Sequence, residues 1–135
     1  MHSDIIVLIE DNPDDAGLTK RTLAKCGVNN PIYVIDDGIK AINWIDSLKV
    51  PPMLVLLDLG LPGVDGVELL RYLKSTLQTF SIPVVILTGS ENEKDRVRGK
   101  VIDGNGYLIK PLACIDFIQE TTRIGLYWRL DRKGE

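Results

Sequence analysis

Residues 53–66 read MLVLLDLGLPGVDG, and this stretch decides the fold class. Residues 53–57 are all apolar, which is typical of a short strand that is buried on both faces of a sheet. Asp58 follows the run directly, and the glycines and proline of residues 60–63 predict a turn before a helix that begins near Asp65. The stretch is therefore predicted to be a buried strand that ends in a carboxylate, followed by a loop and a helix.

The same alternation of apolar run and helical pattern occurs five times along the chain. Buried strands separated by helices predict a parallel sheet that is covered on both faces and joined by right-handed crossovers. Five such units in a chain of this size favour an α/β fold, the flavodoxin-like doubly wound (βα)5 architecture with strand order 2-1-3-4-5. The other predicted strands are Ile5–Ile9, Ile32–Ile35, Val84–Leu87 and Tyr107–Ile109, and the predicted helices cover residues 13–26, 38–48, 65–75, 91–103 and 112–130.

Length and composition predict one folded domain over residues 1–135, with an extended C-terminal helix. The chain has 135 residues, of which 44% are hydrophobic, so it can bury a core. Its net charge of −3 offers no basic face for a phosphate backbone, and we expect no direct binding to nucleic acid.

The remaining composition argues against membrane insertion and against several catalytic centres. The apolar runs are far shorter than the roughly 20 residues that span a bilayer, so no membrane partner is expected. The N-terminus lacks a basic region followed by a long apolar one, and we expect a cytoplasmic protein. Cys26 and Cys114 have no C-x-x-C spacing, and His2 is the single histidine. These counts argue against a zinc site or a Ser/His/Asp triad.

Polar side chains follow four of the predicted strands, at the edge of the sheet where such folds bind ligands. They are Glu10 and Asp11, Asp58, Thr88 and Lys110. Two unit charges about 4 Å apart repel by about 4 kcal/mol at an effective dielectric of about 20, so clustered carboxylates need a counter-ion. A site that offers only oxygen ligands favours Mg²⁺ over zinc, which prefers nitrogen and sulfur ligands. A magnesium site beside a lysine and a hydroxyl predicts phosphoryl transfer to a carboxylate.

These segments together resemble the receiver domain of two-component response regulators. The resemblance is carried by the pair at residues 10–11 (ED), the loop at 58–66 (DLGLPGVDG), the pair at 88–89 (TG) and residues 107–111 (YLIKP). It covers nearly the whole chain, and each segment stands at the end of a predicted strand. The long final helix with its aromatic end is also similar to single-domain regulators that partner phytochrome-type kinases.

The resemblance implies a role for each carboxylate at this edge. Asp58 would accept a phosphoryl group from a sensor histidine kinase or a phosphotransfer protein. Asp11 and Asp58 would bind Mg²⁺ through their side chains. Gly60 would bind it through its backbone carbonyl, and Glu10 through water.

The resemblance also implies how the signal would be passed on. Thr88 and Lys110 would contact the acquired phosphoryl group, and Tyr107 would change rotamer as Thr88 moves. The surface formed by residues 91–103, the last strand and the last helix would then change and bind protein partners. The chain would be a switch that catalyses only its own phosphorylation and dephosphorylation. The peptide bond between Lys110 and Pro111 is often cis in this family.

Three other interpretations compete with this one. An aspartate-nucleophile phosphohydrolase needs a second carboxylate two residues after its nucleophile, and here that residue is Gly60. A flavodoxin-like or dinucleotide-binding domain is disfavoured because residues 10–13 (EDNP) place two negative charges where a pyrophosphate would lie. A receiver-like interaction module that is never phosphorylated remains open, although the acceptor residues are all present.

The last predicted helix carries two apolar stripes where a monomer needs one. The excess predicts a protein contact, most simply a two-fold dimer, through the stripe that contains Phe117, Ile124 and Trp128. The alternative is that the tail folds back over its own core. The stripe assigned to the sheet contains Ile115, Ile118, Thr122 and Leu126, and the stripe assigned to a partner contains Phe117, Thr121, Ile124 and Trp128.

Overall fold

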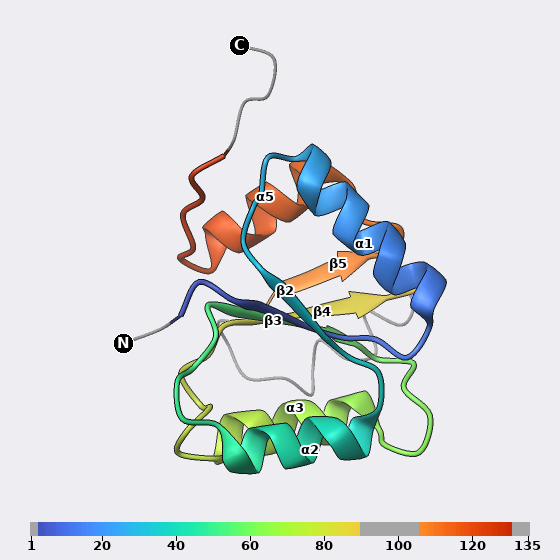
Figure 1. Cartoon of the computed structure of the whole chain (residues 1–135), viewed down its shortest axis with the longest axis vertical. Coiled ribbons are helices and arrows are strands. Elements are labelled where there is room, and N and C mark those ends of the chain that lie inside the picture. The colour runs from blue at the N-terminus through green and yellow to red at the C-terminus, as the bar shows by residue number, and fades with distance from the viewer. Residues whose placement is uncertain (1–2, 90–105, 131–135) are drawn as a thin grey trace.

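The computed structural model describes residues 3–89 and 106–130, in which strands and helices alternate (Figure 1). The predicted helix at residues 91–103 lies outside the described residues. Each described strand agrees with its predicted range to within one residue at either end. The elements are β1 (Ile6–Ile9), α1 (Pro13–Lys25), β2 (Ile32–Ile35), α2 (Gly38–Ser47), β3 (Leu54–Asp58), α3 (Gly66–Ser75), β4 (Val84–Thr88), β5 (Gly106–Ile109) and α5 (Cys114–Arg123).

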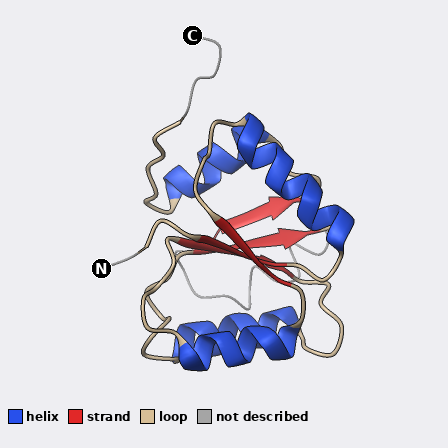
Figure 2. Cartoon of the chain, in the orientation of Figure 1, coloured by secondary structure: helices blue, strands red, loops and turns tan. Residues whose placement is uncertain are grey.

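The five strands form one parallel sheet in the order β2-β1-β3-β4-β5, which confirms the predicted topology. Helices α1 and α5 lie on one face of the sheet, and α2 and α3 lie on the other (Figures 1 and 2). Every residue of β1, β3 and β4 is buried. This burial on both faces explains why these strands are continuous apolar runs.

Alternate residues of the central strands face two separate cores. Val7 and Leu57 point to the side covered by α2 and α3, where Leu69 packs against them. Ile6 and Leu56, on the same two strands, point to the opposite side. The period of two along a strand therefore divides the apolar residues between both layers of helices.

Three helices begin with a polar residue that caps the backbone. The Oδ1 atom of Asn12 accepts hydrogen bonds from the N–H groups of Asp14 at 2.9 Å and Asp15 at 3.1 Å. Asp37 and Asp65 cap α2 and α3 in the same way. Such caps stabilise a helix by about 1 kcal/mol, and they fix the point at which each helix leaves the loop beyond its strand.

The C-terminal helix is shorter than predicted, because α5 ends at Arg123 and not near Leu130. Gly125 adopts a φ of +100°, which only glycine reaches without strain. The N–H of Leu126 then donates to the carbonyl of Thr121 at 2.9 Å, so the chain turns back at this point. The prediction of an extended final helix is therefore wrong, since apolar spacing alone does not reveal a left-handed glycine.

The returning tail covers the core of its own chain. Trp128 lies with its ring centroid 5.3 Å from that of Phe117, and its indole N–H donates to the Oγ1 atom of Thr121 at 2.7 Å. Phe117 and Thr121 are fully buried, whereas Ile115 is 67% exposed. The stripe that the sequence assigned to a partner therefore faces the core, and its Phe117 is not available to another protein. The large aromatic ring takes the buried position because it removes more apolar area from water.

Cys26 and Cys114 form a disulfide between the end of α1 and the start of α5, with their Cα atoms 5.5 Å apart. Their wide separation in sequence concealed this pairing, because only the fold brings the two helix ends together. Within the described ranges, no helix has both the length and the apolar character that crossing a bilayer requires.

Candidate functional site

The carboxyl ends of β1, β3 and β5 bring the predicted polar residues together. Glu10 follows β1, Asp58 ends β3 and Lys110 follows β5. Because parallel strands end at one edge, residues about 100 positions apart in sequence meet there. They line a cavity of about 330 Å³, whose wall is formed by Glu10, Asp11, Asn12, Asp15, Asp58, Gly60, Gly89 and Lys110.

The ammonium group of Lys110 pairs with three carboxylates in this cavity. Its Nζ atom lies 3.1 Å from Oε1 of Glu10, 3.2 Å from Oδ2 of Asp15 and 3.3 Å from Oδ1 of Asp58. The side chains of Glu10 and Asp58 are almost completely buried, and that of Lys110 is 22% exposed. Among the described residues of the cavity, one cation therefore serves several partly desolvated anions, and negative charge is in excess.

Burial and the neighbouring Asp58 change the protonation of Glu10. Burial, together with the hydrogen bond and the negative charge of Asp58, raises the pKa of Glu10 from 4.5 to about 7, although Lys110 and the N–H of Asn12 act in the opposite direction. For Lys110, burial favours the neutral amine. The hydrogen bond with Glu10 and the charges of Asp58 and Glu10 outweigh that effect and hold the pKa of Lys110 above its usual value. The lysine is thus a permanent cation here.

The donor set of the cavity fits a hard divalent cation. Glu10, Asp11 and Asp58 each offer one carboxylate oxygen, and these atoms all lie within 4.8 Å of one another. Asp11 is half-buried, so this corner of the cavity is open to solvent. Oxygen-only donors with room for water match the preference of Mg²⁺ and Mn²⁺. A cation would also relieve the repulsion that raises the pKa of Glu10.

The other predicted residues surround this cluster. The N–H of Gly60 donates to Oδ1 of Asp58 at 3.2 Å, which orients the carboxylate, and Gly60 itself lines the cavity. Thr88 ends β4 and is fully buried, and its carbonyl accepts the N–H of Lys110 at 2.8 Å. Gly89, the next residue, reaches the cavity wall. The bond between Lys110 and Pro111 is cis, as expected.

The comparison with known families identifies the family of this fold and site. Residues 6–122 match the family model described as the response regulator receiver domain. The chain belongs to this family. Receiver domains of this type are phosphorylated on an aspartate and generally act as phosphoacceptors that do not turn over a substrate.

Individual relatives support the assignment over nearly the full length of this receiver. FilR2 of Methanothrix harundinacea, described as a probable methanogenesis regulatory protein, is 38% identical over 128 residues, which cover 92% of this chain and 83% of FilR2. The response regulator Rcp1 of Synechocystis is 31% identical over 129 residues, which cover 92% of this chain and 88% of Rcp1.

Solved structures give the same result. The bacteriophytochrome response regulator AtBRR aligns with a TM-score of 0.88 and 35% identity over 98% of this chain and 100% of AtBRR. The Mn²⁺-bound form of Rcp1 aligns with a TM-score of 0.69 and 28% identity over 96% of this chain and 100% of that one. The receiver fold and the kinship with phytochrome-associated regulators are thus both supported.

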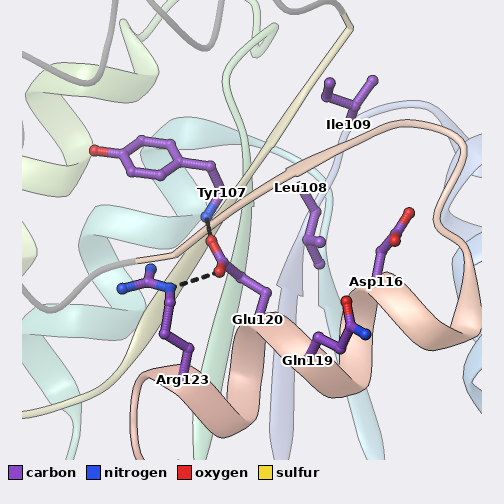
Figure 3. Close-up of a pocket in the computed structure, with 7 residues that line it drawn as sticks. All are labelled: Tyr107, Leu108, Ile109, Asp116, Gln119, Glu120 and Arg123. Carbon is purple, nitrogen blue, oxygen red and sulfur yellow. Dashed lines mark hydrogen bonds and ion pairs between the residues drawn. The ribbon is translucent and has the colours of Figure 1, made fainter.

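Tyr107, the predicted switch residue of this receiver, is held by α5. Its N–H donates to Oε2 of Glu120 at 2.7 Å, and the other carboxylate oxygen of Glu120 accepts from Nε of Arg123 at 2.7 Å (Figure 3). A Cβ atom on Gly106 would lie 2.9 Å from Cγ of Glu120, so glycine is needed for this close approach. In the described part of the surface predicted to switch, a hydrogen bond from the β5 backbone to Glu120 therefore links β5 to α5, and an ion pair with Arg123 holds Glu120 in place.

Two residues of this arrangement were missed by sequence reasoning. Asp15 stands in the first turn of α1, where a carboxylate complements the helix dipole, yet it also pairs with Lys110. The local pattern gave no signal for this pairing, because it depends on how α1 lies beside the end of β5. Glu120 gave no signal either, because its role depends on how closely α5 approaches β5.

Proposed function

We propose that this receiver accepts a phosphoryl group on Asp58 from a histidine kinase or a phosphotransfer protein, and that the modification changes its surface for a protein partner. The observation that carries the proposal is the single cation of Lys110 among the carboxylates of Glu10, Asp15 and Asp58 at the edge of the sheet. In this arrangement Asp58 can act as the nucleophile, and the positive charge of Lys110 beside it compensates the negative charge of the transferred group.

The proposed transfer is an in-line displacement at phosphorus. A carboxylate oxygen of Asp58 forms a bond to phosphorus while the bond to the nitrogen of the donor histidine breaks, and the imidazole leaves. The N–H of Gly60 holds Oδ1 of Asp58, which orients the nucleophile. Lys110 then pairs with the oxygens of the phosphoryl group, and the hydroxyl of Thr88 donates to one of them.

We propose Mg²⁺ as the cation that this chemistry requires. Asp11 and Asp58 would bind it through carboxylate oxygens, Gly60 through its carbonyl and Glu10 through water. When bound, the ion neutralises charge on the transferred group. The mutual distances within the cluster of Glu10, Asp11 and Asp58, and the Mn²⁺-bound form of the relative Rcp1, support this assignment.

The proposed switch acts on the surface that contains β5 and α5. A phosphoryl group that draws Thr88 inward would change the space available to the ring of Tyr107, biasing an equilibrium between two conformations. The link from Glu120 to the N–H of Tyr107 supports this route, because it couples α5 to the same residue.

The kinase partner is proposed to be of the phytochrome type. The similarity to the bacteriophytochrome response regulator AtBRR supports this choice over an arbitrary kinase.

A homodimer through the C-terminal region stays a prediction. Ile124 and Trp128 pack against the chain's own core and are half-buried, so only part of each side chain is left for a partner. Equilibrium sedimentation of the wild type beside Trp128→Ala tests it, and a monomer in both samples would contradict it.

Labelling by acetyl phosphate tests the acceptor role. The wild type should incorporate phosphate in the presence of Mg²⁺ and none when EDTA is present from the start, and Asp58→Asn should incorporate none in either case. Asp65→Asn is the matched control, because Asp65 caps α3 from the same loop and asparagine keeps a capping oxygen. Full labelling of Asp58→Asn would refute the assignment. No labelling of the wild type, together with failure to bind beryllofluoride, would favour an interaction module that is not phosphorylated.

A further inference from the structure

The thiols of Cys26 and Cys114 meet outside the lining of the acceptor cavity. Cys26 is the C-cap of α1, and Cys114 is the first residue of α5. The two are joined as a disulfide, and their Cα atoms lie 5.5 Å apart. This separation is within the range of about 4.4 to 6.8 Å that a disulfide spans without backbone movement. The two helix ends are therefore close enough for a disulfide.

The two cysteines differ in their exposure to solvent. Cys26 is 8% exposed, whereas Cys114 is exposed. Cys114 also lies at the N-terminus of a helix whose N-cap residue, Ala113, makes no side-chain hydrogen bond. Free N–H dipoles at such a position stabilise a thiolate, although Asp116 in the same turn partly offsets the effect. Cys114 is thus the thiol that a reagent in solution meets first.

Neither helix depends on the disulfide for its place in the fold. Helix α1 buries Ala16 and Leu23, and α5 buries Phe117 and Thr121. The backbone N–H of Cys26 bonds to the carbonyl of Thr22 whether or not its sulfur is oxidised. The reduced chain should therefore stay folded with the two thiols in reach of each other. A disulfide with one exposed cysteine in such a setting can be reduced and formed again.

We propose that Cys26 and Cys114 form a reversible thiol–disulfide site that is oxidised by small-molecule disulfides. The thiolate of Cys114 attacks one sulfur of the reagent, whose S–S bond breaks and releases one thiolate. The thiolate of Cys26 then attacks the sulfur of Cys114 and displaces the second reagent thiolate. Two protein thiols are oxidised, and one small disulfide is reduced to two thiols. Only residues 111–113 separate Cys114 from Lys110, so oxidation ties the loop after the site lysine to α1.

Stepped mixtures of reduced and oxidised glutathione test this proposal on the full-length chain. After each incubation, free thiols are blocked with N-ethylmaleimide and the mass of the intact protein is measured. The wild type should pass from two labels to none with little singly labelled protein, and should recover both labels in excess glutathione. Cys26→Ser should carry one glutathione, formed roughly ten-fold faster than any adduct on Cys114→Ser, because only Cys114 is exposed.

Three results would overturn it. They are a wild type that keeps two alkylatable thiols in every mixture, a wild type that accumulates a stable glutathione adduct, and equal rates of adduct formation in the two serine variants. The first two rest on the wild type alone, so they hold even if a variant fails to fold. Because no phosphoryl donor is present, the outcome is independent of the function proposed for Asp58.

Discussion

The stability of the metal-free protein should depend on pH through Glu10. On folding, burial and the neighbouring Asp58 raise the pKa of Glu10 from 4.5 to about 7. Below pH 4.5 the carboxyl is protonated in both states and contributes no pH dependence. Between pH 4.5 and 7 the unfolded chain ionises and the folded one does not, so the free energy of unfolding falls as the pH rises. Above pH 7 both states are ionised and the loss is complete.

The size of this loss follows from the two pKa values. A difference of one in pKa corresponds to about 1.4 kcal/mol, so ionised Glu10 should destabilise the fold by about 3 kcal/mol. Because Glu10 is only 1% exposed, solvent screening removes little of this effect. Glu10→Gln keeps the shape of the side chain and cannot ionise, and its difference in stability from the wild type should contain the Glu10 contribution alone.

Urea unfolding in EDTA at pH 4.5, 5.5, 7 and 8 measures that difference. Relative to Glu10→Gln, the wild type should lose about 3 kcal/mol of unfolding free energy between pH 4.5 and 8, mostly below pH 7. Glu68→Gln is the control, because Glu68 is 62% exposed and pairs with Arg71 on the surface. The difference in unfolding free energy between the wild type and Glu68→Gln should vary by less than about 1 kcal/mol over the same pH range. A wild-type minus Glu10→Gln difference that stays constant across this range would refute the reasoning.

Two further predictions concern the side of the sheet covered by α1 and α5. The disulfide of Cys26 and Cys114 closes a loop across 88 positions, for which chain entropy predicts a stabilisation of about 4 to 5 kcal/mol. Urea unfolding with and without reductant should show that loss for the wild type and none for Cys114→Ser, and an unchanged midpoint would contradict it. Trp128→Ala should cost about 3 kcal/mol through the lost ring packing and hydrogen bond, and Trp128→Phe about 1 kcal/mol through the hydrogen bond alone. Tyr127→Ala, at an 81% exposed position, should change stability by less than about 0.5 kcal/mol, and equal losses at both positions would argue against the folded-back tail.

The sheet and its active edge were predictable because the central strands carry an unambiguous signal. The strand formed by residues 54–57 presents apolar side chains to both faces of the sheet. Asp58 follows this run, so it lies at the carboxyl edge of the sheet at whichever position in the strand order the strand is placed. Parallel pairing then brings Glu10 and Lys110 to the same edge. Local pattern and topology agree at these positions, so sequence reasoning located the cavity.

The C-terminal region was not predictable in the same way. Two apolar stripes on one helix do not reveal which faces the sheet, and the choice was settled by the burial of Phe117 against a tail that returns after Gly125. The pairings of Asp15 with Lys110 and of Cys26 with Cys114 depend on how α1 lies against the last strand and helix. These are tertiary contacts, which no periodic pattern in the local sequence indicates.

The most direct test of the central claim is to locate the phosphoryl group itself. The chain is phosphorylated with acetyl phosphate and Mg²⁺ and then treated with borohydride, which reduces an aspartyl phosphate to homoserine. Peptide mass spectrometry of the product should place homoserine at position 58 and leave the neighbouring carboxylates Asp11 and Asp15 unchanged. Homoserine at another aspartate, or none in a protein shown to bind Mg²⁺, would contradict the assignment of Asp58 as the phosphoacceptor.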